Sequence, residues 1–577
     1  MRYPLAILLT LVSTSWAQAQ ILERDSRFHS LAVDAQRGMV VAQEKLAAEV
    51  GAQILEQGGN AVDAAVATGF ALAVTLPQAG NIGGGGFMMI HIAETSETYA
   101  LDYREMAPSA AHRDMFLDEQ GNADSWLSRS SIMSSGVPGT VAGFLDAQER
   151  FGKLTRQQVL APAIALARDG FPVSEAQAWS FAQSAAKFVR YESSSQYFLP
   201  GGTPPAAGDL FRQVDLADTL ARIAEQGRDG FYLGETAQLI VDEMQRHNGL
   251  ISLHDLANYQ PRWRDPVVGN YGGYRVVSMP PPSSGGVHLL QILGVLERLG
   301  IGQYEHNSAD YLHYLVEAMR YAYADRSKYL GDPDFVDVPV ANLLDGEYLQ
   351  ALADRIQPDQ ATPSTQIEPG RYLPPESPQT THYSVWDGEG NVVSNTYTIN
   401  FSYGNGIAVQ GAGFLLNNEM DDFAAAPGVP NGFGLLGGDA NAVEAGKRPL
   451  SSMTPTLVFD QEGKPVIATG SPGGSAIITI VLQVILNILE HDMSPAQAVS
   501  VPRIHHQWMP DSIRWESGIS ADTRHLMELR GHVFDGDPRV WGKAETIMLE
   551  DGVLKGGVDP RWPDSGAASM PAYLLPR

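Results

Sequence analysis

The sequence contains no cysteine in its 577 residues. Disulfide bonds, thiolate nucleophiles, iron–sulfur clusters and cysteine-ligated zinc sites are therefore excluded. Basic residues are also scarce, because 39 Lys and Arg stand against 66 Asp and Glu and give a formal net charge of -27. A chain this acidic is unsuited to nucleic acid or to an anionic membrane as its main partner, so the charge indicates a soluble protein.

Apolar runs of membrane-spanning length are missing as well. The apolar stretch at residues 4–12 is too short to cross a bilayer. It follows a basic residue, Arg2, and precedes the small-x-small sequence Ala17-Gln18-Ala19, which is typical of a secretory signal. We expect residues 1–19 to be a cleaved signal peptide and the exported, cysteine-free protein to be periplasmic. A permanent N-terminal anchor is the alternative.

The remaining composition is that of a folded protein with a large core, since 44% of the residues are hydrophobic and 18% are charged. Helical patterns dominate before residue 380, for example over residues 156–169, 214–226 and 307–329. Residues 356–379 have little periodicity and are typical of a linker. Many short β segments are expected after Asn400. This distribution predicts one mixed, layered fold that draws on both halves of the chain.

A predicted hairpin begins at Thr380. Residues 380–387 and 391–400 form two strand-like runs joined by the turn Gly388-Glu389-Gly390. If these three residues are the loop, the register places Thr380 directly opposite Thr398. Because side chains alternate faces along a strand, polar groups of the second run gather beside Thr380. The pattern predicts a cluster of hydroxyl groups at the start of a strand.

Other chemistries find little support in the sequence. It has no Gly-x-Ser-x-Gly elbow and no His-Glu-x-x-His zinc helix. The adjacent His505 and His506 point to opposite faces of a strand, which favours a structural role over a metal site. Glu419 with Asp421-Asp422 lacks the spacing of an EF-hand loop, so calcium binding is the weaker interpretation there.

A threonine hydroxyl is a poor nucleophile in the middle of a chain. At a chain N-terminus it has its own base, the α-amine, whose unperturbed pKa is about 7.7–8.0. Thr380 is therefore a candidate nucleophile if the chain is cut between Gln379 and Thr380. On these residues alone, a Thr-rich surface strand is the simpler interpretation.

Several separate motifs, in order from about Gly51 to Arg561, give this chain a resemblance to the γ-glutamyltranspeptidases. The junction Gln379-Thr380-Thr381-His382-Tyr383-Ser384-Val385 looks like the site at which these proenzymes cut themselves. The other motifs are Arg104-Glu105-Met106-Ala107-Pro108, Leu416-Asn417-Asn418-Glu419-Met420-Asp421-Asp422-Phe423, Arg448-Pro449-Leu450-Ser451-Ser452-Met453 and Thr469-Gly470-Ser471-Pro472-Gly473-Gly474-Ser475.

The resemblance implies an α+β fold, the αββα sandwich of the N-terminal nucleophile hydrolases, with two stacked antiparallel sheets between helical layers. It implies a large subunit of residues 20–379 and a small catalytic subunit of residues 380–577, intertwined in one domain. Thr380 would cut the chain after Gln379 and then attack the γ-amide of a γ-glutamyl substrate.

Further site residues are carried over from the family position by position. Thr398 matches the residue that hydrogen-bonds the nucleophile. Gly473 and Gly474 match the backbone N–H donors of the oxyanion hole, where side chains would obstruct the developing charge. Arg104, Ser451 and Ser452 match the residues that bind the donor α-carboxylate. The residues that match the ammonium-binding set are Asn400, Glu419 and Asp422. A structural ion pair is the alternative role for Arg104.

Two positions depart from the pattern of many bacterial relatives. Glu419 replaces a Gln, and Phe433 stands in the lid-like loop of residues 427–438 where a Tyr is common. The overall prediction is a self-processing γ-glutamyltransferase and glutathione hydrolase that needs no metal or organic cofactor. Its partners are glutathione, other γ-glutamyl compounds and amino acid or peptide acceptors, with no nucleic acid and no membrane after signal removal. A glutaryl (cephalosporin) acylase and a non-catalytic periplasmic binding protein are the alternatives.

Overall fold

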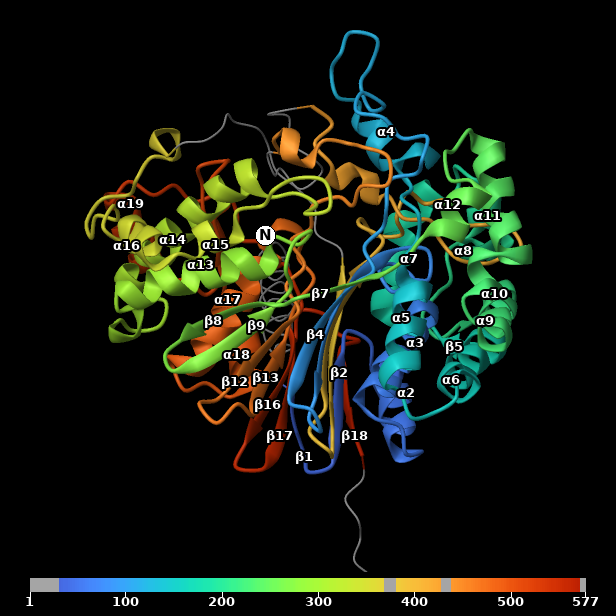
Figure 1. Ribbon diagram of the computed structural model, residues 1–577, viewed down its shortest axis with the longest axis horizontal. Coiled ribbons are helices and arrows are strands. Elements are labelled where there is room, and N and C mark those ends of the chain that lie inside the picture. The colour runs from blue at the N-terminus through green and yellow to red at the C-terminus, as the bar shows by residue number, and fades with distance from the viewer. Residues whose placement is uncertain (1–30, 368–379, 427–436, 571–577) are drawn as a thin grey trace, which may run out of the picture.

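The computed structural model describes residues 31–367, 380–426 and 437–570. Two seven-stranded antiparallel sheets lie face to face in the centre of the molecule (Figure 1). The first sheet has the order β1 (Leu31–Ala35), β17 (Val553–Val558), β16 (Glu545–Glu550), β13 (Pro465–Thr469), β12 (Thr456–Phe459), β9 (Tyr274–Ser278) and β8 (Val267–Tyr271). The second has the order β18 (Gly566–Ser569), β2 (Gly38–Ala42), β10 (Thr381–Asp387), β11 (Val392–Thr398), β3 (Gly85–Ile92), β4 (Glu97–Asp102) and β7 (Arg262–Arg264).

Each outer face is covered by helices, which completes four layers (Figure 1). The helices on the side of the second sheet are α2 (Lys45–Glu56), α3 (Ala61–Thr75), α5 (Thr140–Phe151), α6 (Arg156–Asp169), α7 (Glu175–Phe188), α8 (Glu192–Phe198), α9 (Val214–Gln226), α10 (Asp229–Tyr232), α11 (Gly234–His247) and α12 (Leu253–Asn258). Those on the side of the first sheet are α13 (Gly285–Arg298), α14 (Ala309–Tyr329), α15 (Val340–Leu343), α16 (Gly346–Ala353), α17 (Ile477–Leu489), α18 (Pro495–Ser500) and α19 (Ala521–Leu529). The predicted sandwich is confirmed.

Sequence chemistry explains the two helices nearest the sheets. Every residue of α3 is buried, and the helix packs on β10 and β11. Its first turn is closed by a capping box in which Asn60 and Asp63 exchange side-chain-to-backbone hydrogen bonds. Helix α17 is also apolar on nearly all sides, which suits an element enclosed by the protein rather than one lying on its surface.

Both sheets combine strands from before and after Thr380, so neither half of the chain forms a sheet alone. In the second sheet β10 and β11 occupy the middle, between β2 and β3. The register pairs Thr381 with Tyr397 and Trp386 with Val392, and it continues to Thr380 opposite Thr398. The predicted hairpin register is therefore confirmed.

The expected short β segments after Asn400 are present from β12 onward, and they include β14 (Ile504–His505) and β15 (Arg514–Trp515). Between β11 and β12, by contrast, the described chain forms turns, the short 3₁₀ helix η5 (Glu419–Asp422) and isolated bridges such as Ala408 with Leu415. Glycines with positive φ, among them Gly404 and Gly411, interrupt the extended backbone that a strand needs.

Residues 356–367 were expected to be part of a linker, but they lie against the body of the protein. Ile356, Ala361 and Ile367 are buried. The backbone of Ser364 donates to Asp511, and its carbonyl accepts from Trp508. A few apolar side chains, far apart in the sequence, anchor this segment to the body of the protein. Such a spacing produces no helical or strand periodicity, so a linker was expected.

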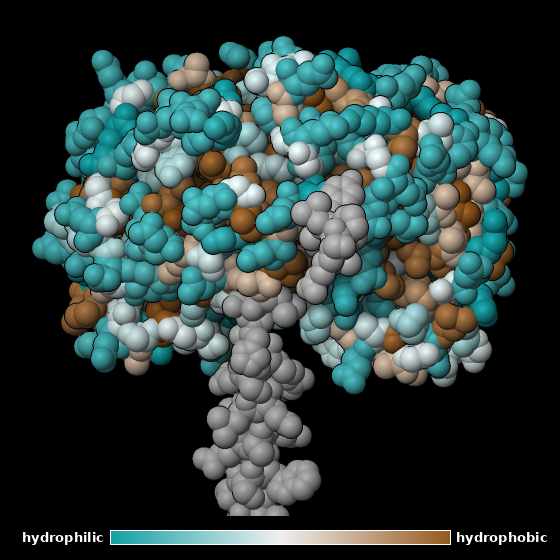
Figure 2. All heavy atoms as spheres, turned by 90° about the horizontal axis from the view of Figure 1, so that it is seen from below, coloured by the Kyte–Doolittle hydropathy of each residue, from teal (hydrophilic) through white to brown (hydrophobic). Residues whose placement is uncertain are grey.

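The surface agrees with the acidic composition. Figure 2 shows a face on which hydrophilic residues predominate and hydrophobic residues form smaller patches between them. Within the described ranges, no helix combines the length and apolar character needed to cross a membrane. The expected signal peptide, Gln379 and Phe433 lie outside the described residues.

Candidate active site

A small pocket with a volume of about 20 Å³ lies at the start of β10. Its walls come from both halves of the chain, so the site exists only because the two halves interlock. The lining residues are Arg104, Arg326, Thr380, Thr398, Asn400, Glu419, Asp422, Leu450, Ser451, Ser452, Met453, Gly474, Ser475 and Ile477. Of the described residues predicted for the site, all but Gly473 line this pocket.

The hydroxyl pair lies at one end of the pocket. Thr380 and Thr398 are both buried, and their Oγ1 atoms are 3.4 Å apart. Thr398 Oγ1 also accepts a hydrogen bond of 2.8 Å from the backbone N–H of Asn400. This bond comes with a left-handed backbone at Asn400, whose φ is 72°, so the chain turns sharply after β11. The turn carries the Asn400 side chain into the pocket beside the hydroxyl pair.

A glycine turn forms the wall nearest the first sheet. The chain leaves β13 at Thr469 and reaches the 3₁₀ helix η7 (Gly474–Ala476) and then α17. Gly473 and Gly474 have φ values of 151° and 56°, which other residues rarely adopt. A Cβ at Gly473 would stand 2.7 Å from Ile480 Cδ1. The turn therefore requires glycine at this point, and it brings a helical N-terminus, which stabilises negative charge, to the pocket.

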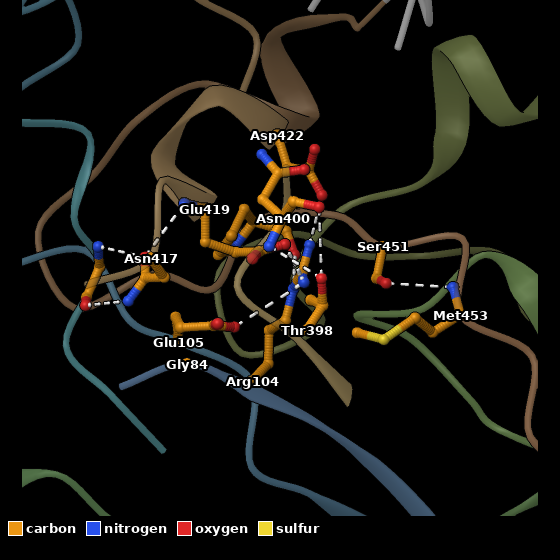
Figure 3. Close-up of polar contacts among 12 residues, drawn as sticks. Gly84, Arg104, Glu105, Thr398, Asn400, Asn417, Glu419, Asp422, Ser451 and Met453 are labelled. Carbon is orange, nitrogen blue, oxygen red and sulfur yellow. Dashed lines mark hydrogen bonds and ion pairs between the residues drawn. The ribbon is translucent and has the colours of Figure 1, made fainter. Parts of the chain in front are cut away.

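A buried ion cluster fills the opposite side (Figure 3). The Arg104 guanidinium is 1% exposed and pairs with Glu419 through Nη1. Its Nη2 lies 2.5 Å from Asp422 Oδ2, and its Nε donates to the carbonyl of Pro449 at 3.2 Å. Arg104 thus forms the ion pair that was the alternative to a substrate-binding role.

Burial dominates the ionisation of these acids. It raises the pKa of Glu419 to about 8 and that of Asp422 well above its usual range, although Arg104 opposes both shifts. Burial lowers the pKa of Arg104, but Glu419 and Asp422 together raise it above its ordinary value. The guanidinium is therefore a permanent cation.

Among the residues that line the pocket, three side-chain oxygens beside Arg104 accept no hydrogen bond from any described residue. They are Asn400 Oδ1, Glu419 Oε2 and Asp422 Oδ1, and each is fully buried. Unpaired buried acceptors are costly, and they are rare unless a ligand or water completes them. An ammonium group has three N–H donors in a compact arrangement. The cluster is suited to a cationic group with that number of donors.

The two serines present hydroxyl groups on another wall. Ser451 Oγ accepts from the backbone N–H of Met453 at 3.1 Å, and Ser452 Oγ accepts from Arg326 Nη2 at 3.1 Å. A hydroxyl that already accepts one bond still has its O–H to donate. Both serines can therefore donate to an anionic group in the pocket.

Two residues of the site were missed from the sequence. Glu105 is fully buried, its carboxylate is 3.8 Å from Arg104 Nη1, and burial raises its pKa to about 7. Its position next to Arg104 in a recognised motif was an available signal. Arg326 lies on α14, and only its helical context was visible in the sequence.

The described residues contain no group of three or more His, Asp and Glu side chains arranged for a metal ion. His505 contacts Thr479 and Gln507, whereas His506 contacts Asp511. The adjacent histidines therefore have separate partners, as a structural role requires.

Comparison with known proteins places this geometry among enzymes. The family model for gamma-glutamyltranspeptidase matches residues 47–569. The glutathione hydrolase proenzyme of Escherichia coli (strain K12) is 51% identical over 531 residues, which cover 92% of this chain and 91% of that protein. Acylase ACY 1 proenzyme of Pseudomonas sp. (strain SE83) is 38% identical, covering 90% of this chain and 91% of its own.

Solved structures agree. Cephalosporin acylase from Bacillus halodurans is similar with a TM-score of 0.84 at 28% identity, covering 94% of this chain and 98% of that one. Helicobacter pylori gamma-glutamyltranspeptidase matches with a TM-score of 0.55 at 50% identity, covering 56% of this chain and 93% of that chain. The expected N-terminal nucleophile hydrolase fold is confirmed.

Proposed function

The chain belongs to the γ-glutamyltranspeptidase family, and from this premise we propose that Thr380 becomes its N-terminal nucleophile by cleavage after Gln379. The protein is a γ-glutamyltransferase and glutathione hydrolase made as a proenzyme. It moves the γ-glutamyl group of glutathione and related amides to water or to an amino acid or peptide acceptor.

Processing uses the same hydroxyl as catalysis. Thr380 Oγ attacks the carbonyl carbon of Gln379, the C–N bond breaks, and the nitrogen of Thr380 takes up a proton to become an α-amine. Water then hydrolyses the resulting ester. This releases the large subunit, residues 20–379, with a carboxylate end, and the small subunit, residues 380–577, with a free Thr380.

Catalysis repeats this chemistry on a donor. The α-amine of Thr380 takes the hydroxyl proton as Oγ attacks the γ-carbonyl, and Thr398 holds the hydroxyl in position 3.4 Å away. The backbone N–H groups of Gly473 and Gly474 stabilise the tetrahedral oxyanion, which forms at a helical N-terminus. The departing amine takes a proton, and an acceptor amine or water then releases the γ-glutamyl group.

Donor recognition is carried by one observation: three unpaired buried acceptors lie beside a buried guanidinium. Asn400, Glu419 and Asp422 bind the donor α-ammonium through those oxygens. Arg104 and the hydroxyls of Ser451 and Ser452 bind the α-carboxylate. The donor therefore replaces contacts within the ion cluster by contacts to its own two charged groups. The donor α-ammonium thus faces acceptor oxygens, and the donor α-carboxylate faces a guanidinium and two hydroxyl groups.

A glutaryl acylase is the second candidate, because relatives with acylase names share the fold. A glutaryl group has the carboxylate but no ammonium. It would leave the acceptors of Asn400, Glu419 and Asp422 unpaired, which disfavours such a donor by a large factor. The γ-glutamyl donor is therefore the better fit.

Location and partners extend the proposal. The signal-like residues 1–19 direct export to the periplasm, and processing leaves the two subunits as partners in one intertwined domain. The residues described here require no metal or organic cofactor for any step.

Intact mass and donor turnover test the proposal. The wild-type chain gives two fragments that meet at Gln379/Thr380 and releases p-nitroaniline from γ-glutamyl p-nitroanilide faster than from glutaryl p-nitroanilide. Thr380→Ala gives one uncut, inactive chain. Thr380→Ser, the matched control, is cut and active, though more slowly. An uncut wild-type chain that still turns over the γ-glutamyl donor would overturn the mechanism.

A further inference from the structure

Arg326 is a second buried cation of the pocket, separate from the Arg104 cluster. It projects from α14, is 4% exposed and lines the same pocket as Thr380. Its Nε donates to Ser284 Oγ at 2.8 Å, and its Nη2 donates to Ser452 Oγ at 3.1 Å. The guanidinium therefore lies directly behind the part of the pocket formed by Ser451 and Ser452, which we call the serine wall.

The contact fixes the direction of the Ser452 hydroxyl. Because Ser452 Oγ accepts from a charged donor, its own O–H points elsewhere and is available to the pocket. Ser284, which also accepts from Arg326, donates to the backbone carbonyl of Ser451 at 2.8 Å. One guanidinium thus holds both serines, one through its side chain and the other through its backbone.

We propose that Arg326 is a positioning residue for donor binding, which orients the Ser452 hydroxyl toward the donor α-carboxylate. This inference rests on the proposed γ-glutamyl specificity. It assigns the carboxylate end of the donor to two cations, with Arg104 in direct contact and Arg326 acting through Ser452.

Three p-nitroanilide donors separate this role from a structural one. The γ-glutamyl donor has both α-groups, the glutaryl donor has only the carboxylate, and the 4-aminobutyryl donor has only the ammonium. Arg326→Gln should lower kcat/KM about 10- to 100-fold on the first two, mainly through KM, because a hydrogen bond to a charged group is lost. The change on the 4-aminobutyryl donor should stay below about threefold.

Arg320→Gln is the matched control. Arg320 is a buried arginine on the same helix, but it contacts Asp511 and residues 362–364 rather than the pocket. Its replacement disturbs α14 without touching the serine wall, so any loss should be equal for the three donors. Arg326→Lys keeps the charge but cannot donate to both serine hydroxyls in the same geometry, so its kcat/KM should lie between those of the wild type and Arg326→Gln.

An equal loss on all three donors with Arg326→Gln would overturn the inference, because it would show a structural effect only. If that variant fails to fold, Ser284→Ala removes one acceptor of the guanidinium and should give a smaller loss with the same donor dependence. A wild-type enzyme that prefers the glutaryl donor contradicts the proposed function instead. The two failures are therefore distinguishable.

Discussion

Glu419→Gln tests whether the ammonium site depends on an acid that is mostly protonated at neutral pH. Burial raises the pKa of Glu419 to about 8, so only about a tenth of the free enzyme has this carboxylate ionised at pH 7. At pH 9 the ionised share is about nine tenths. Gln has the same shape and can accept a hydrogen bond, but it never carries the charge.

The expected effect therefore depends on pH. Near pH 6.5 the two proteins should have similar kcat/KM for a γ-glutamyl donor, because the protonated acid resembles the amide. Above pH 8 the wild type should be about tenfold better, since a hydrogen bond to an ionised acceptor is worth roughly 1.4 kcal/mol more than one to a neutral acceptor. The midpoint of this change should lie near pH 8, where the pKa of Glu419 places it.

The ratio of wild-type to variant kcat/KM is the quantity to follow from pH 6 to 9.5. The Thr380 amine and the donor ammonium titrate in the same range, but they are common to both proteins and cancel in the ratio. The glutaryl donor, which has no ammonium, should give a flat ratio. A ratio for the γ-glutamyl donor that does not change with pH would refute the assignment of Glu419 to the ammonium site.

Two further predictions concern the hydroxyl pair and the acid limit of the fold. Thr398→Val removes the hydroxyl 3.4 Å from Thr380, so kcat should fall about 10- to 100-fold with little change in KM, whereas Thr396→Val on the same strand face should change kcat less than about threefold. Burial lowers the pKa of His532 to about 2 and that of His506 to about 4, and it also lowers the pKa of His313. These groups stay neutral in the folded protein while the unfolded chain binds protons below about pH 6.5. Their stabilisation is therefore complete above about pH 6.5 and is lost as the pH falls toward the folded-state pKa, about 4 for His506 and about 2 for His532. The melting temperature should drop over that window, and less steeply in His532→Gln; an equal slope in His532→Gln would contradict the reasoning.

Local sequence patterns predicted several elements of the fold correctly. The helices at residues 156–169 and 214–226 have the predicted bounds, and the hairpin register followed from one three-residue turn. These features depend on neighbouring residues, where periodicity and turn chemistry act directly. The backbone path between β11 and β12 was not predicted from local patterns. It depends on glycines with positive φ and on packing against distant parts of the chain.

The candidate site was predictable as a set of residues but not as a set of partners. The resemblance assigned Arg104 to the donor carboxylate and Glu419 to the ammonium, but it did not show that these two side chains pair with each other. That pairing depends on the distance between residues 315 positions apart. Glu105 and Arg326 were missed for the same reason, since their roles follow from burial and proximity rather than from spacing.

Under the proposed assignment of the site, the ion cluster explains why a zwitterionic donor suits this pocket better than a simple cation or anion. Arg104, Glu105, Glu419 and Asp422 put three carboxyl groups around one guanidinium in a buried site. A lone anion would compete with those carboxyl groups for Arg104, and a lone cation would leave the serine wall unused. A γ-glutamyl group provides one charge for each wall, so binding exchanges ion pairs without adding net charge to the buried region. Donor selection then follows from the requirement that no buried charge be left unpaired, and the pH dependence of Glu419→Gln measures that requirement directly.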